Sequence, residues 1–201
     1  MTRLIRSLAV FLLLSSFAFA QSKDARNKFE KAMRELDRRN VPKAEQLFRE
    51  ATNLAPEWIE AHVQLGDVLF LQNKYDAAAE TYAKAAALEE KQKKLATEDR
   101  RRMLDQLGVS QAMGRHLDQA IATYKKAIEQ DPEYPLFHYN LACSYAEKGD
   151  LDNALPHLKK SWELRDNMPR GQDFPDPRKD SSFKKFWNNP KFQEAVENMV
   201  V

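Results

Sequence analysis

The sequence has little of the material from which most catalytic and nucleotide-binding sites are built. It holds one cysteine and five glycines in 201 residues. Cys143 is alone, so no disulfide can form within the chain. There is no glycine-rich phosphate loop, no Gly-x-Ser-x-Gly elbow, and no His-x3-His or His-Glu-x2-His pair. We therefore expect no catalytic residue, no cofactor and no metal; an enzyme with an unrecognised composite site is the minor alternative.

An excess of one charge is also missing. The chain has 32 Lys and Arg against 30 Asp and Glu, and Arg3 and Arg6 account for the whole difference. Both arginines lie in the first 20 residues, so the remainder is balanced at 30 against 30. Such a balance argues against a bulk nucleic-acid partner.

The first 20 residues have the pattern of an export signal. The two arginines precede an apolar run over residues 8–17, which is short for a membrane span. The small-x-small sequence of residues 18–20 then predicts cleavage between Ala20 and Gln21. We expect a signal peptide over 1–20, a periplasmic or secreted protein, and no membrane insertion after cleavage. An uncleaved anchor is the alternative.

The main feature of the sequence is a phrase that returns at steps of 34, 42 and 34 residues. In each copy a small residue is followed four positions on by a large apolar one, and three further on by another small one. The copies are Ala44, Phe48, Ala51; Ala78, Tyr82, Ala85; Ala120, Tyr124, Ala127; and Ala154, Leu158, Ser161. A period of this size indicates stacked helical or other supersecondary units.

Apolar residues within each unit recur at spacings of three and four, which predicts helices, and no stretch alternates as a strand does. Gly149 suits a left-handed helix C-cap and Pro135 a first helical turn. Gly66 and Gly108 are expected at helix crossings, where a side chain would hold the two backbones apart. The fold class is predicted to be all-α.

These phrases, with first helices such as His62-x2-Leu65-Gly66-x2-Leu69, resemble the tetratricopeptide repeat (TPR). The resemblance implies a right-handed α-solenoid of four TPR-like helix pairs within residues 21–168. The units cover about 25–58, 59–92, 101–134 and 135–168. His62 and His138 occupy the place of a packing aromatic, so they are interpreted as packing residues rather than metal ligands. Cys143 is interpreted as a packed side chain, with pairing between chains as the alternative.

Two segments interrupt or follow the repeats. An eight-residue insertion, 93–100, is predicted to add about one turn to each flanking helix and so form a helical hairpin. Its bases form either a solvated face or an anion patch: Lys91, Lys93, Lys94, Arg100, Arg101 and Arg102.

After a linker over 169–180, residues 181–201 predict two capping helices that cover the last repeat. The apolar stripes are Phe183, Phe186, Trp187 and Phe192, Val196, Met199. This segment resembles the closing unit of a group of bacterial TPR proteins, which implies an exported envelope protein.

The resemblance also implies a concave groove lined by the first helices. The residues expected on it are Glu60, Val63, Asp67, Phe70, Arg102, Asp105, Val109, Met113, Leu136, Tyr139 and Asn140. A Lys/Asn/Arg clamp for a terminal carboxylate is missing, since the matching places hold Phe29 and Met33. We expect a non-catalytic scaffold that binds a peptide or protein partner. The alternative is a self-associating structural protein, a homo-oligomer, whose groove is filled by its own tail or a second copy.

Overall fold

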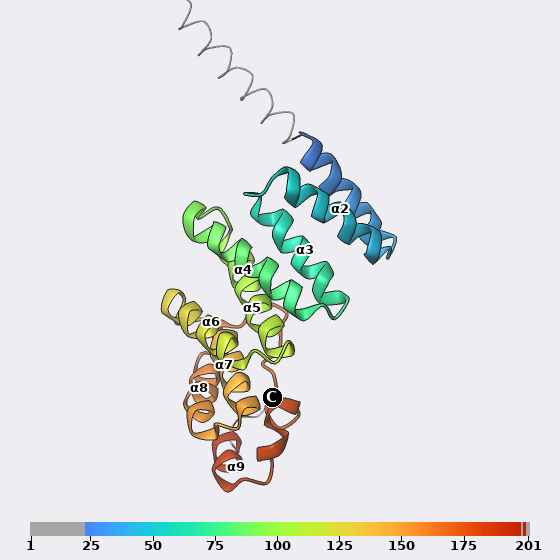
Figure 1. Cartoon of the computed structure of the whole chain (residues 1–201). Coiled ribbons are helices and arrows are strands. Elements are labelled where there is room, and N and C mark those ends of the chain that lie inside the picture. Colours follow the sequence, from blue (N-terminus) through green and yellow to red (C-terminus); the bar gives the residue numbers. More distant parts are fainter. Residues whose placement is uncertain (1–22, 198, 200–201) are drawn as a thin grey trace, which may run out of the picture. The chain divides into compact units, whose positions relative to one another are not determined.

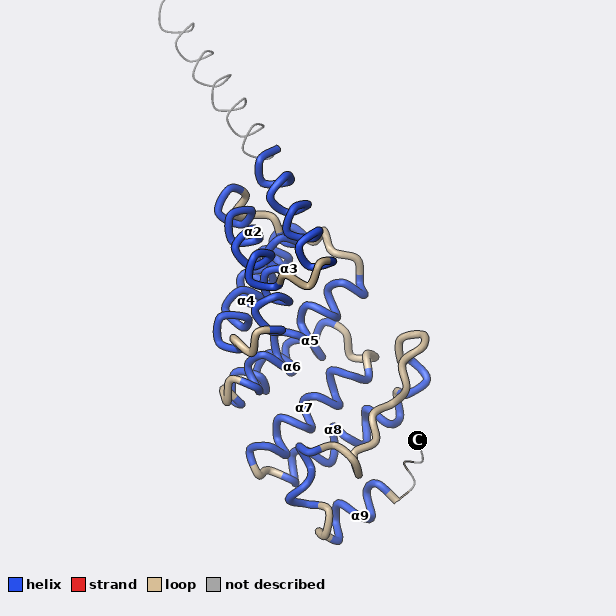
Figure 2. The backbone as a smooth tube through the Cα atoms, turned by 90° about the vertical axis from the view of Figure 1, so that its right-hand side faces the viewer, coloured by secondary structure: helices blue, strands red, loops and turns tan. Residues whose placement is uncertain are grey.

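The computed structural model describes residues 23–197 and 199 of the chain. All regular structure in this part is helical, without a strand (Figure 2), which confirms the all-α prediction. The predicted signal peptide and its cleavage site between Ala20 and Gln21 lie outside the described residues. The chain divides between Lys94 and Leu95 into two compact units, each described by itself.

Unit 1 contains two helix pairs, which are coloured from blue to green in Figure 1. A helix over residues 23–37 precedes α2 (Val41–Leu54), and α3 (Ile59–Leu71) precedes α4 (Tyr75–Gln92). Helix α3 packs against both α2 and α4. The first helix begins two residues before the predicted unit 25–58, and α3 and α4 lie within the predicted unit 59–92.

Unit 2 contains two further pairs and the C-terminal segment. The pairs are α5 (Thr97–Met113) with α6 (Leu117–Gln130), and α7 (Pro135–Lys148) with α8 (Leu151–Glu163). The segment that follows holds two short 3-10 helices, η1 (Arg165–Asn167) and η2 (Ser181–Phe186), and α9 (Pro190–Val196). Helix α7 packs against α5, α6, α8 and η2.

The repeated phrase forms the buried centre of every second helix. All its members are at most 1 % exposed. They are Ala44, Phe48, Ala51, Ala78, Tyr82, Ala85, Ala120, Tyr124, Ala127, Ala154, Leu158 and Ser161. Burial of the large apolar side chain in each copy stabilises the fold by about 2 kcal/mol or more.

The turn inside each pair has the same backbone geometry four times. The residues with positive φ there are Arg39, Asn73, Arg115 and Gly149, and their steps of 34, 42 and 34 match those of the alanines. Each N–H bonds back three residues, and the next N–H bonds back five, as from Asp150 to the Tyr145 carbonyl. This is the Schellman motif, which satisfies carbonyls at a helix end. The predicted role of Gly149 is confirmed.

The insertion lengthens the helices on either side of it. Helix α4 has 18 residues against 14 in α2 and α6. Helix α5 has 17 residues against 13 in α3. Each is therefore about one turn longer than its counterparts, as expected. The arrangement of the two extensions as a hairpin stays a prediction.

Gly66 and Gly108 lie where a helix meets the tyrosine of its partner helix. A Cβ atom at Gly66 would be 2.7 Å from the Tyr82 ring, and one at Gly108 would overlap the Tyr124 ring. Neither ring can withdraw easily, because both tyrosines are fully buried. The predicted need for glycine at the crossings is confirmed.

Replacement of Gly66 by leucine should therefore destabilise the protein by about 2–4 kcal/mol through overpacking. Urea unfolding measures the change. The control is Ala83→Leu, which adds a similar side chain at an exposed position of α4 and should cost far less. Equal midpoints for the two variants would contradict the crossing.

The C-terminal segment packs on the last repeat, with two differences from the prediction. Phe183 and Phe192 are at most 1 % exposed and stack on each other with ring centroids 5.4 Å apart. Residues 181–186 form a 3-10 helix rather than an α-helix, and Trp187 is 37 % exposed rather than packed. The linker 169–180 also contributes to the core, because Phe174 is buried against Trp162.

Removal of everything after Asp166 should expose the apolar face of α7 and α8 and cost several kcal/mol, because two fully buried phenylalanines alone contribute about 2 kcal/mol or more each. We expect aggregation or a lowered unfolding midpoint, measured by light scattering and urea titration. A truncated chain that stays monomeric and equally stable would show that the tail is a partner-binding arm rather than a cap.

Candidate groove on unit 2

In unit 1, the predicted groove residues on α3 differ in exposure. Glu60 is exposed, whereas Val63 is only 4 % exposed, so the expectation that Val63 contacts a partner is wrong. Asp67 is half-buried and accepts a hydrogen bond of 2.5 Å from the Tyr82 hydroxyl. Phe70 packs edge-on against Tyr75, with ring centroids 5.4 Å apart. Side-chain packing between α3 and α4 therefore uses most of this face.

In unit 2, the predicted residues on α5 are more accessible. Arg102 and Met113 are exposed, Met113 by 51 %, and Val109 is half-buried. On α7, Leu136 and Asn140 are half-buried. The open part of the predicted surface therefore lies between the ends of α5 and α7.

Tyr139 is not available to a partner, because the chain's own tail covers it. Its side chain is 3 % exposed and packs edge-on against Phe174 and Phe183, with centroids 5.7 and 6.2 Å away. Its hydroxyl donates to Asp180 Oδ2 at 2.9 Å. The expectation that Tyr139 contacts a partner is wrong. Two phenylalanines of the tail already cover its ring, and the Asp180 carboxylate already accepts the hydrogen bond of its hydroxyl.

Beside the covered tyrosine a groove of about 370 Å³ stays open; we call it the α5–α7 groove. Predicted residues Val109, Met113 and Asn140 line it. The remaining lining residues come from α5 to α7 and the tail: Ala112, Arg115, Tyr124, Cys143, Ser144, Glu147, Asp180, Ser181 and Ser182. The sequence did not indicate that residues 180–182 form one wall, since that requires the tail to fold back onto α7.

A part-buried polar network joins two lining residues, Asn140 and Tyr124, to Asp105. Asn140 Nδ2 donates to Asp105 Oδ1 at 2.5 Å, and the Tyr124 hydroxyl donates to the Asp105 main-chain carbonyl at 3.1 Å. Burial raises the pKa of Asp105 to about 6, and the bond from Asn140 opposes this only in part. Burial, and then the charge of Asp105, raise the pKa of Tyr124.

Asp105 should make the protein less stable as the pH rises. Its pKa is about 6 in the folded protein, against an ordinary value of 3.8. The protonated carboxyl therefore favours the folded state at low pH, and this contribution is lost as the pH rises from about 3.8 to about 6. Relative to wild type, Asp105→Asn should gain about 1–3 kcal/mol between pH 4 and pH 7.5. Urea unfolding across that range measures the gain, with the exposed Asp173→Asn as control. A difference that does not vary with pH would contradict the buried carboxylate.

The lone cysteine is a packed side chain, as interpreted from the sequence. The Cys143 thiol lies 3.7 Å from Asp180 Oδ2. Burial, and then the charge of Asp180, raise the pKa of this thiol well above its ordinary value. A thiol in this state is a poor nucleophile.

The histidines serve in packing. His62 Nε2 lies 3.0 Å from the Pro56 carbonyl, and His138 Nε2 lies 3.1 Å from the Pro132 carbonyl. Burial lowers the pKa of both rings. No group of three or more metal-ligating side chains occurs within residues 23–197 and 199.

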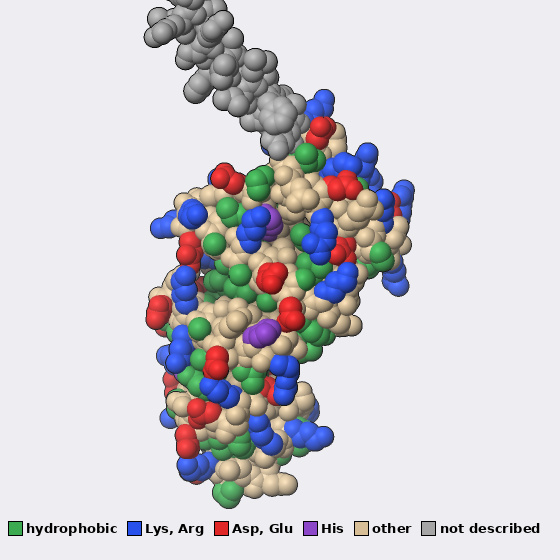
Figure 3. All heavy atoms as spheres, in the orientation of Figure 1, with side chains coloured by type: hydrophobic (Ala, Val, Ile, Leu, Met, Phe, Trp, Pro, Cys, Tyr) green, Lys and Arg blue, Asp and Glu red, His purple; other side chains and the backbone are tan. Residues whose placement is uncertain are grey.

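The bases near the insertion are partly used by ion pairs. Arg101 Nε lies 2.7 Å from Asp131 Oδ2 and its Nη1 2.8 Å from Glu98 Oε1, while its guanidinium lies over the Tyr134 ring. On the face that Figure 3 shows, basic and acidic side chains are interspersed. Both observations favour a solvated face over an anion patch.

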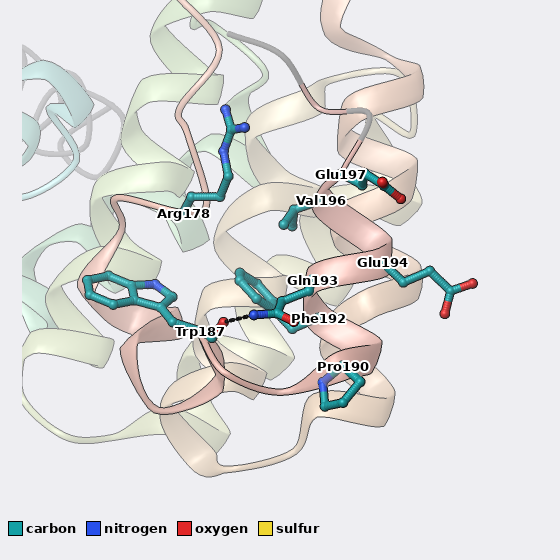
Figure 4. Close-up of a pocket in the computed structure, with 8 residues that line it drawn as sticks. All are labelled: Arg178, Trp187, Pro190, Phe192, Gln193, Glu194, Val196 and Glu197. Carbon is teal, nitrogen blue, oxygen red and sulfur yellow. Dashed lines mark hydrogen bonds between the residues drawn. The ribbon is translucent and has the colours of Figure 1, made fainter.

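A second hollow of about 660 Å³ lies on the C-terminal segment (Figure 4). Trp187, Pro190, Phe192 and Val196 form its apolar part. The Gln193 amide donates to the Trp187 carbonyl across it at 3.1 Å. In Figure 4 the Glu194 carboxylate points away from Trp187.

Models of known protein families match the repeats of this chain. The model described as "Tetratricopeptide repeat" matches residues 29–92 and a second of the same description 137–167, while one described as "TPR repeat" matches 116–149. The chain belongs to the tetratricopeptide repeat family. Helix α5, on one side of the groove, lies between the matched ranges.

Individual relatives of this TPR chain agree with the assignment. A curated relative, the BBSome complex member BBS4 of Bos taurus, is 28 % identical over 59 % of this chain; the match spans 28 % of that protein's length. The solved structure described as "MamA MSR-1 C2" is 26 % identical, with a TM-score of 0.60 over 72 % of this chain and 78 % of that one. That of "MamA RS-1 ArsTM double mutant" is 21 % identical, with a TM-score of 0.61 over 83 % and 90 %; it supports the fold alone.

The repeats identify this TPR chain as a protein–protein interaction scaffold. The family is generally non-catalytic. No helix in the part of the chain that the structure describes has the length and apolar character to cross a membrane.

Proposed function

We propose that this protein is a non-catalytic adaptor that holds a peptide segment of a partner protein in the α5–α7 groove. The observation that carries the proposal is the groove that stays open between α5, α7 and the tail. Val109, Ala112 and Met113 give it an apolar wall, and Met113 is half exposed. A volume of about 370 Å³ suits one or two side chains of a bound segment.

Known proteins support an assembly role. The curated relative is a member of the BBSome complex, and this chain is similar to 28 % of that protein's length. To hold a partner, the protein needs the exposed surface of the α5–α7 groove and no catalytic residue.

Filling the groove should abolish binding. Ala112 lines it, so Ala112→Trp should block it, whereas Ala122→Trp at an exposed position of α6 should not. A photo-cross-linker at Met113 in the native host should capture a partner in the wild-type and Ala122→Trp backgrounds and lose it with Ala112→Trp. Circular dichroism and unfolding midpoints check that both variants fold. Capture that is unaffected by Ala112→Trp would contradict binding of the partner in the α5–α7 groove.

The tail that covers Tyr139 favours one alternative, a structural protein whose groove is used by its own segments. In the described structure the tail of the same chain lies there. If a second copy used the remaining groove, sedimentation velocity would give a dimer or larger species that Ala112→Trp dissociates. A protein that stays monomeric at all concentrations would contradict self-association and favour the adaptor function.

We also propose that the protein is exported to the cell envelope, as periplasmic or secreted protein. The support is the sequence pattern of Arg3, Arg6, the apolar run and Ala18–Ala20. N-terminal sequencing of the protein from its native host should begin at Gln21. An intact Met1 in the mature protein would show that the leader is kept.

A further inference from the structure

We propose that the α5–α7 groove selects a segment that carries a lysine or arginine next to an apolar residue. This rests on the proposed function and adds the chemistry of the partner. The groove combines an apolar wall with the carboxylates of Asp180 and Asp105, whose hydrogen bonds come from uncharged donors. A third carboxylate, that of Glu147, makes only a long ion pair with Arg115 at the rim. A cation on the bound segment would balance the charge that these contacts leave.

Asp180 is the first of these carboxylates. Its Oδ2 accepts from the Tyr139 hydroxyl at 2.9 Å and the Cys143 thiol at 3.7 Å, and its Oδ1 accepts from the Ser182 N–H at 2.9 Å. All three donors are neutral. They hold the carboxylate in place at the groove wall without cancelling its charge.

Asp105 is the second. It lies beneath Asn140, whose amide is its hydrogen-bond donor at 2.5 Å, and Asn140 lines the groove. The charges of Asp105 and Asp180 contribute to the raised pKa values of the Tyr124 hydroxyl and the Cys143 thiol, which both line the groove. A negative potential in a partly dry groove favours a cation.

Glu147 adds a third carboxylate at the rim. Its carboxylate pairs with Arg115, another lining residue, at a long 3.7 Å, and the Arg115 side chain is 78 % exposed. Such an exposed, long pair is weak and can yield to a better placed cation. Lys185 lies close by, but its amine donates to the Glu147 main-chain carbonyl at 2.8 Å.

The apolar wall fits the same side chain. The stem of a lysine or arginine can lie along Val109 and Met113 while its charged end reaches the carboxylates, as these residues do at other apolar surfaces. An acidic segment would meet Asp180 and Glu147 with like charge. The groove therefore discriminates by charge as well as by shape.

The test uses an oriented library of short peptides with mixed flanking positions and one fixed central residue: lysine, arginine, glutamate or leucine. The intact chain is immobilised, and the retained amount of each pool is measured at low salt and at high salt. The wild type should retain the lysine and arginine pools about fivefold more than the glutamate pool, and the ratio should fall as salt rises.

The variant Asp105→Asn/Glu147→Gln should bring that ratio close to one, whereas Glu163→Gln, at an exposed position of α8, should leave it unchanged. A preference that survives the double variant would overturn the assignment to these carboxylates. Equal retention of all pools, lost with Ala112→Trp, would overturn the charge preference and keep the proposed groove. No retention of any pool above the Ala112→Trp background would overturn both.

Discussion

The fold depends on the contact between a tyrosine ring and the bare face of a helix at Gly66 and at Gly108. With no side chain at either glycine, the two helices of a pair come close enough for Tyr82 and Tyr124 to be fully buried. The alanines around each ring complete the crossing, because only small residues leave space for the second backbone. Once the crossing is set, the rotation of each helix is set too. That rotation decides that Val63 faces inward while Met113 faces solvent.

The tail has two roles in unit 2. Phe174 and Phe183 close the apolar face of the last repeat, while Asp180 carries a carboxylate to the edge of the remaining opening. The same segment therefore both seals the core and shapes the surface that a partner would meet. Its tyrosine contact joins the two roles, since Tyr139 packs on the phenylalanines and donates to the carboxylate.

The sequence predicted the parts of the structure that depend on contacts within one repeat. The alanine spacing, Gly66, Gly108 and Gly149 were sufficient for the helix pairs and their turns, because these glycines meet partners within the same repeat. The left-handed role of Arg39, Asn73 and Arg115 was missed, although their spacing repeats that of Gly149. Residue type concealed it, since arginine is not a residue that usually marks such a turn.

The groove was predictable only in part for a different reason. Val109, Met113 and Asn140, which the register of the repeat indicated, line the groove, and partner binding there stays a prediction. The burial of Tyr139 was not predicted, because it depends on where an irregular segment with three prolines and a glycine returns to the repeats. No periodicity describes such a segment, so the sequence gives its composition and not its path.

The two arginines at left-handed turn positions have a consequence for the stability of the repeats. A side chain in this backbone conformation costs roughly 1–2 kcal/mol relative to glycine, and Arg39 and Arg115 both carry that cost. Gly149 holds the same conformation without it. The four turns are therefore alike in backbone geometry and unequal in energy.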